Sequence, residues 1–457
     1  MADFPHILPP ALGHPGEEHA GMRAPMMQIG SVVTDQQWAE EWSDQLENLL
    51  VEVGEIFPRV EVRRRAADFV RGLLGPISRK NGWQLAEYVG DEHAWGLQHL
   101  LSRAVWEPDM LRDFVRRYVL DGLAMPGAGP GGAGVLVIDE TGFEKRGRSS
   151  AGVARQYTGT AGAVVNCQIG VMAAWATAAG QAMIDRELYL PEEWMQDRDR
   201  CAGAHIPGER AFATKPRLAE QMISRVLPDL PPGHVWVAAD EVYGRDGAFR
   251  SSLEERGLPY AVTIQANQKV LDRPGFRHVA GLVARIAEEC DWLSLPAGPS
   301  QLDTRIWQWW VRRLPDPEAG IGADDQQSAA DPSCWARWMI ARRRPETPAD
   351  RDYYLAWGPP DTPIEELVLV PGARWRVEEA IKLGKSACGL ADYEVRSYHG
   401  WYRHITLAQL AAAFLAVQQA TTAVAEGDLH CDGDGTTTHT GGSRPVYHQH
   451  LHALQPR

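Results

Sequence analysis

Two aspartates, each directly after a short apolar run, are the residues best placed to do chemistry. Asp139 follows residues 135–138 and Asp240 follows residues 234–239, and both runs are typical of buried strands. The ends of strands in an α/β sheet expose side chains on a rigid base. Two carboxylates held close together repel each other, so such a pair is stabilised by protonation or by a shared divalent cation. Taken alone, each Asp is better explained as an ordinary turn or cap residue, so the prediction depends on the whole set.

A helix predicted from about residue 375 to residue 388 offers the third carboxylate that a metal cage would need. Arg374, Glu378, Lys382 and Lys385 are spaced by four, four and three residues, so they share one helical face. Glu379 points about 100° away from that face. The face therefore pairs Glu378 with three cations, and a solvent-exposed stripe of salt bridges is the alternative interpretation.

Three other carboxylates compete with Glu378. Glu394, in the segment ADYEVRS, is the main rival, although its position beyond the helix also suits a loop that packs on the core. Asp185 and Glu241 are weaker rivals. Glu241 directly follows Asp240, so we expect it to point to the other side of the strand end.

The net charge of −14 opposes a nucleic-acid partner, because neutralising phosphates requires basic residues. The basic residues are nevertheless clustered, near residues 59–80, 145–155 and 337–344. Lys145, Arg146, Arg148 and Arg155 follow the first Asp among Gly and Ser residues. This segment is either a phosphate-binding loop or a mobile surface loop.

The periodicity of apolar residues divides the chain into seven parts. We expect an extended arm at 1–33, a helical domain of four or five helices at 34–123, a linker at 124–134, an α/β core at 135–267, a β-rich insertion at 268–365, a return to the core at 366–425 and a disordered tail at 426–457. Three antiparallel strands, at 135–138, 166–177 and 181–190, open the core. Within the helical domain, residues 83–106 fit a helix-turn-helix or a plain helical hairpin.

Trp307 and Trp309 alternate on one face of a predicted strand in the insertion, while Trp310 faces the other way. Aromatic rings can stack on unpaired bases. Packing in the core of the inserted sheet is the alternative for each ring.

Several classes of protein and site do not fit the sequence. No apolar run is long enough for a membrane span, and the N-terminus does not have the pattern of a signal peptide, so we expect a cytoplasmic location. The six cysteines never form a CxxC pair, and the histidines near the C-terminus fit no structural zinc motif.

Three blocks of sequence resemble bacterial insertion-sequence transposases with an RNase H-like, retroviral-integrase-type fold. Residues 137–176 resemble the first catalytic block, residues 236–246 the second, and residues 374–397 the third. The signature Arg-x3-Glu-x6-Lys of the third block falls on Arg374, Glu378 and Lys385. A Tyr usually precedes that Arg by three residues, and here the position is Pro371, which places the phosphate contact of that Tyr in doubt.

The resemblance implies an RNase H-like α/β core that carries a β-rich insertion and is preceded by an all-helical domain. It implies that Asp139, Asp240 and Glu378 bind two Mg²⁺ or Mn²⁺ ions, and that Arg374 and Lys385 hold DNA phosphates. Lys382, the 145–155 loop and the two tryptophans would add DNA contacts, one Trp meeting a flipped nucleotide.

The implied activity is metal-dependent cleavage of transposon-end DNA and strand transfer into target DNA, close to the nucleoid. The implied partners are the terminal inverted repeats, the target DNA and a second copy of the chain, with no membrane. A domesticated descendant that only binds DNA, and an RNase H-like nuclease without strand transfer, are the alternatives.

Overall fold

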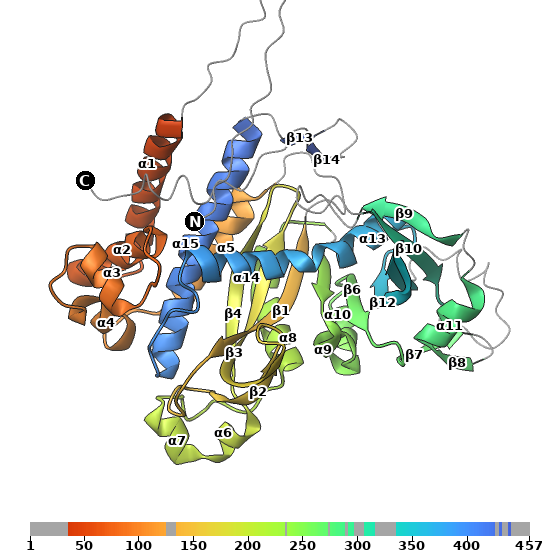
Figure 1. The fold of residues 1–457 in the computed structure, drawn as a ribbon, viewed down its shortest axis with the longest axis horizontal. Coiled ribbons are helices and arrows are strands. Elements are labelled where there is room, and N and C mark those ends of the chain that lie inside the picture. The colour runs from red at the N-terminus through yellow and green to blue at the C-terminus, as the bar shows by residue number, and fades with distance from the viewer. Residues whose placement is uncertain are drawn as a thin grey trace, which may run out of the picture.

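The computed structural model describes residues 35–124, 134–233, 235–272, 275–287, 291–296, 306–315, 335–425, 429–431 and 437–439. The predicted arm at 1–33, most of the linker and most of the tail, with its histidines, lie outside the described residues. The described part consists of an N-terminal group of helices, a large mixed sheet and C-terminal helices that cross the sheet (Figure 1). None of its helices combines the length and the apolar character that a membrane span requires.

The predicted helical domain contains five helices. They are α1 (Asp35–Gly54), α2 (Val60–Leu74), α3 (Gly82–Tyr88), α4 (Trp95–Ser102) and α5 (Pro108–Gly122). In α2, Val62, Ala66, Phe69 and Leu73 are buried at helical spacing. The prediction of four or five helices is confirmed.

The core sheet combines antiparallel and parallel strand pairs. Its strands are β1 (Val135–Glu144), β2 (Ala154–Thr158), β3 (Ala163–Ala176), β4 (Gln181–Tyr189), β5 (Trp236–Ala239) and β6 (Tyr260–Ile264). β3 pairs antiparallel with both β1 and β4, whereas β5 pairs parallel with β1 and with β6. The strands run in the order β4-β3-β1-β5-β6 and form a mixed α/β core, as expected. β2, which pairs with the first half of β3, was not predicted.

The β-rich segment extends the core sheet instead of forming a separate one. β12 (Thr347–Gly358) pairs antiparallel with β6, and β11 (Ala336–Arg344), β10 (Ile306–Arg313) and β9 (Leu293–Pro296) follow in that order. The core strands and these four strands thus form one 10-stranded sheet. A hairpin of β7 (Lys269–Asp272) and β8 (Gly275–His278) and a helix, α11 (Val279–Ile286), precede these strands.

The remaining helices lie between the strands in sequence and after them. They are α6 (Glu192–Gln196), α7 (Arg198–Gly203), α8 (Lys215–Val226), the 3₁₀ turn η1 (Leu227–Asp229), α9 (Glu241–Gly244), α10 (Gly247–Glu255), α13 (Ile364–Ala373), α14 (Trp375–Ala387) and α15 (Tyr398–Ala425). α14 contacts β1, β3 and β4, and α15 contacts β4 and α5 (Figure 1). Within the predicted tail, β13 (Leu429–Cys431) and β14 (Thr437–His439) form an antiparallel pair.

Buried charges on β4 connect the helical domain to the sheet. Asp185 is fully buried, and Arg225 of α8 binds it through two nitrogens at 3.1 Å. Arg186 is also fully buried and donates to Asp109 of α5 and to Thr406 of α15, each at 2.9 Å. These pairs join elements that are distant in sequence, because an unpaired charge in the same place would carry its full desolvation cost.

We expect Arg225→Ala to destabilise the protein by about 3–5 kcal/mol, because it leaves the Asp185 carboxylate buried without its bidentate partner. Arg217→Ala on the same helix removes an exposed guanidinium that pairs with Glu220, and it should cost less than about 1 kcal/mol. Urea denaturation of the two variants measures the difference. Equal losses of unfolding free energy in the two variants would show that the ion pair between Arg225 and Asp185 does not anchor α8.

Candidate active site

The register of two parallel strands brings Asp139 and Asp240 together. Ile138 of β1 pairs with Ala239 of β5, and the two aspartates are the next residues on each strand. Neighbouring strands lie about 4.8 Å apart, so the carboxylates start from adjacent backbone positions. Asp139 is not at the end of its strand as predicted, because β1 continues to Glu144 by pairing with β3. It lies where the pairing between β1 and β5 ends.

Hydrogen bonds to the backbone orient the two carboxylates. Asp240 caps α9, and its Oδ1 accepts from the backbone N of Val242 at 2.8 Å. The Oδ1 of Asp139 accepts from the backbone N of Glu140 at 2.7 Å. Each carboxylate is therefore held by the backbone that directly follows it.

Burial makes negative charge costly at both aspartates. It raises the pKa of Asp139 to about 7, and the neighbouring charge of Asp240 adds to that shift. Burial likewise raises the pKa of Asp240 to about 6, with Glu140 as the next cause. The pair is thus held in a place where an added cation would be strongly favoured.

Arg374 is the cation that the structure places beside this pair. Its Nη1 lies 2.7 Å from Oε1 of Glu378 and 3.6 Å from Oδ2 of Asp139, so it bridges the two carboxylates. Arg374 is the residue between α13 and α14, and Glu378 is one helical turn further along α14. The ion pair confirms the prediction that these two residues share a helical face.

The carboxylates of Asp139, Asp240 and Glu378 are of the kind that binds a divalent cation, although they do not converge on one point in this structure. In the described part of the chain, no three His, Cys, Asp or Glu side chains are close enough to hold a metal ion together. The guanidinium of Arg374 separates Glu378 from Asp139, which accounts for this spacing. The Glu378 side chain is 56% exposed, so a change of rotamer is open to it. Carboxylate oxygens are the ligands that Mg²⁺ and Mn²⁺ prefer.

The rival carboxylates are engaged elsewhere. Glu379 accepts from Gln181 at 3.1 Å, and Glu394 accepts from Arg79 and Asn81 at 3.3 and 3.2 Å. Glu241 accepts from Gln265 at 2.6 Å, and Asp185 is bound by Arg225. None of the four bonds to Arg374 or to either aspartate of the pair.

The residues that were predicted to bind DNA fall into two groups. Lys382, Arg146, Arg148 and Arg155 are exposed. Lys385 is partly buried and donates to the carbonyl oxygen of Gly142 at 3.0 Å. Arg374 is engaged by the carboxylates described above, so it contacts DNA only if it leaves them.

Lys145, Trp307 and Trp309 are placed differently from the prediction. The Lys145 ammonium lies 3.4 Å from the ring centre of Tyr393 and donates to its carbonyl oxygen, and burial lowers its pKa to about 8. Trp309 is fully buried and Trp307 is 9% exposed, with Arg342 over both rings. The β10 strand is interior to the extended sheet, so packing is the explanation for both rings, and neither has a free face for a base in this structure.

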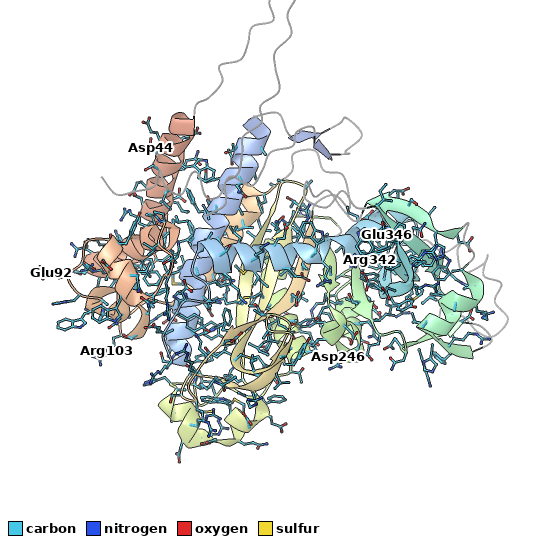
Figure 2. The ribbon with its side chains drawn as sticks, viewed as in Figure 1. Asp44, Glu92, Arg103, Asp246, Arg342 and Glu346 are labelled. Carbon is cyan, nitrogen blue, oxygen red and sulfur yellow. The ribbon has the colours of Figure 1, made fainter. Side chains whose placement is uncertain are left out.

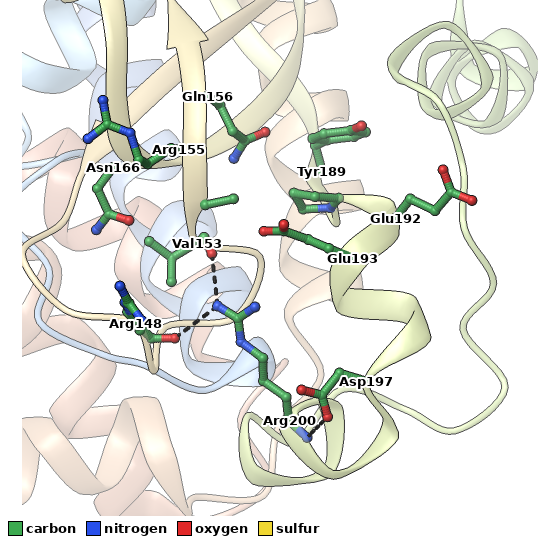
Figure 3. A pocket seen from close by; sticks show the side chains of 12 residues that line it. Arg148, Val153, Arg155, Gln156, Asn166, Tyr189, Glu192, Glu193, Asp197 and Arg200 are labelled. Carbon is green, nitrogen blue, oxygen red and sulfur yellow. Dashed lines mark hydrogen bonds between the residues drawn. The ribbon is translucent and has the colours of Figure 1, made fainter.

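Arg148 and Arg155 line a cavity of about 870 Å³ beside β2 and β3 (Figure 3). Asn166 of β3 and Arg200 of α7 also line it, and the Arg200 guanidinium donates to the carbonyl oxygens of Arg148 and Val153. Glu192 and Glu193 of α6 add two carboxylates to the lining. The cavity is therefore mixed in charge rather than uniformly basic.

The segment predicted as a helix-turn-helix consists of α3, α4 and the turn between them, packed on α2. The Asn81 side chain caps α3 by accepting from Trp83 and Gln84. On α4, Trp95, Gln98, His99 and Ser102 are exposed on one face, and Arg103 follows them (Figure 2). The arrangement fits a plain helical hairpin, and DNA reading by this segment stays a prediction.

Three residues near the aspartates were missed by sequence reasoning. Glu140 binds Lys215 of α8 and Tyr243 of α9, at 2.5 and 3.1 Å. Glu140 was overlooked because strict alternation places it on the face opposite Asp139. For Tyr243, the only signal in the sequence was the Tyr-Gly pair that follows Asp240.

Comparisons with known proteins show what the chain is similar to. Residues 52–278 match the profile of the DDE superfamily endonucleases, a range that includes Asp139 and Asp240 but ends before Glu378. Over this range the chain is therefore similar to the DDE superfamily endonucleases.

Over 328 residues the chain is 26% identical to a probable transposase for insertion sequence element IS701 of Microchaete diplosiphon, covering 72% of this chain and 75% of that protein. A cryo-EM structure of the piggyBac transposase synaptic complex with hairpin DNA aligns with 93% of this chain and 80% of that chain, at 11% identity and a TM-score of 0.43.

We expect Asp139→Asn to stabilise the metal-free protein increasingly as pH rises from about 4 to about 7. The native pKa of Asp139 is raised above that of the unfolded chain, so unfolding releases a proton in this window and stability is lost as pH rises. Because an amide does not titrate in this range, the variant does not lose stability in this way as pH rises. Melting temperatures in EDTA across the pH range measure it, with exposed Asp361→Asn as the control. A difference between variant and parent that stays constant with pH would contradict the buried charge.

Proposed function

We propose that this protein is a transposase that cuts DNA at the ends of a mobile element and joins those ends to target DNA. The observation that carries the proposal is the pair Asp139 and Asp240 on adjacent parallel strands, with Glu378 held above them through Arg374. The match to DDE endonucleases and the likeness to a probable insertion-sequence transposase support it.

The three carboxylates are proposed to hold two Mg²⁺ or Mn²⁺ ions. Such ions, when bound, activate the attacking oxygen and stabilise the leaving oxygen of a phosphodiester. Asp139 and Asp240 supply oxygens from the rigid sheet, and Glu378 supplies them from α14. The burial of Asp139 and Asp240 limits their contact with water, which strengthens the electrostatic interactions of this pair.

Two chemical steps follow from one such site. In the first, a water attacks the phosphorus at the element end, the bond to the 3′ oxygen breaks, and a 3′-hydroxyl is released. In the second, that 3′-hydroxyl attacks a phosphodiester of the target, and a target 3′ oxygen leaves. The number of phosphodiester bonds is conserved in the second step, so it requires no external energy source.

The basic residues are proposed to position the DNA. Arg374 and Lys385 lie on α14 or at its start, within reach of the strand that enters the site, and exposed Lys382 lies between them. Arg148 and Arg155 extend this surface beyond β2. Because two ends must be held together before joining, we infer that two copies of the chain act in one complex.

We expect Asp139→Asn, Asp240→Asn and Glu378→Gln each to reduce cleavage of inverted-repeat DNA in Mg²⁺ by more than the roughly 10–100-fold that loss of an outer-shell group costs. Glu379→Gln is the matched control, because it changes the neighbouring carboxylate of α14 and should leave the rate nearly unchanged. A gel assay of labelled element ends measures cleavage and joining. Cleavage without joined products would favour a nuclease, and binding without cleavage by the parent would favour a domesticated DNA-binding protein.

We expect the double substitution Arg148→Ala and Arg155→Ala to weaken DNA binding and to reduce the slope of log affinity against log salt by about two, since each phosphate contact contributes about 0.9. Arg117→Ala, an exposed arginine of α5, should leave the slope unchanged. Fluorescence anisotropy at several salt concentrations measures both. An unchanged slope in the double variant would remove these residues from the DNA surface.

A further inference from the structure

The carboxylate of Glu140 is bound on both oxygens by residues of two other elements. Oε1 lies 2.5 Å from Nζ of Lys215, the first residue of α8, and Oε2 accepts from the hydroxyl of Tyr243 on α9 at 3.1 Å. The Tyr243 side chain is fully buried, and Glu140 and Lys215 are 18% and 19% exposed. The three residues therefore form a nearly enclosed contact among β1, α8 and α9.

The element that Tyr243 holds is the one that carries Asp240. α9 is a single turn, Glu241–Gly244, which is too short to be stable alone. Asp240 caps it, and the backbone N of Gly244 donates to the carbonyl oxygen of Asp240 at 2.8 Å. A Cβ at Gly244 would lie 1.9 Å from the carbonyl oxygen of Thr263, so the turn is also pressed against β6.

We propose that Glu140 is a positioning residue which, through Tyr243 and Lys215, fixes the α9 turn so that the Asp240 carboxylate faces Asp139. The inference rests on the proposed function, because it assigns Glu140 a purpose in the same metal-binding pair. Glu140 acts through the turn and the backbone, and it need not contact the metal.

The test is Mn²⁺ binding to the full chain by isothermal titration calorimetry, without DNA and without turnover. Tyr243→Phe removes one hydroxyl, and Glu140→Ala removes both bonds. Each should weaken Mn²⁺ binding about 10–100-fold, as the loss of groups that orient metal ligands does elsewhere. Glu140→Gln keeps an oxygen that accepts from Tyr243, so it should lose less than Glu140→Ala.

Tyr189→Phe is the matched control, because its ring also lies near Lys215, 5.9 Å from Nζ, and no bond to Glu140 is lost. If Tyr243→Phe and Glu140→Ala lower the melting temperature but bind Mn²⁺ like the parent, the contact is only structural and the inference is wrong. Should Glu140→Ala fail to fold, Tyr243→Phe decides alone. If the parent binds no Mn²⁺, the proposed function fails instead.

Discussion

The repulsion between Asp139 and Asp240 is the constraint to which the surrounding structure responds. The parallel register of β1 and β5 fixes their backbones side by side, and burial removes the water that would screen their charges. Arg374 partly neutralises them and also binds Glu378. One guanidinium thus links Asp139 to Glu378, the carboxylate that we propose as the third metal ligand.

Much of the fold could be predicted because it depends on local patterns. The apolar run at 135–138, the strand at 260–264 and the helix that carries Glu378 all follow from periodicity over a few residues. The course of β1 beyond Asp139 could not be predicted, because its pairing with β3 compensates for the Gly and Thr residues in that stretch. The pairing of β12 with β6 joins the β-rich segment to the core sheet. It links residues some ninety positions apart, so no local sequence pattern indicates it.

The candidate site likewise has features that the sequence could predict and others that it could not. Helix phase selected Glu378 over Glu379, and the ion pair with Arg374 agrees with that choice. The contacts of Glu140 with Lys215 and Tyr243 could not be predicted, because they depend on how α8 and α9 pack beside β1. Lys145 was expected to be exposed, but it packs on Tyr393, from a loop that lies almost 250 residues further along the chain.

A crystal structure of the protein with Mn²⁺, with the ion located by its anomalous scattering, tests the central claim most directly. The account predicts an anomalous peak between Asp139 and Asp240, with Glu378 turned toward it and the contact between Arg374 and Asp139 broken. A peak bound by other residues, with Arg374 still bridging Asp139 and Glu378, would contradict it.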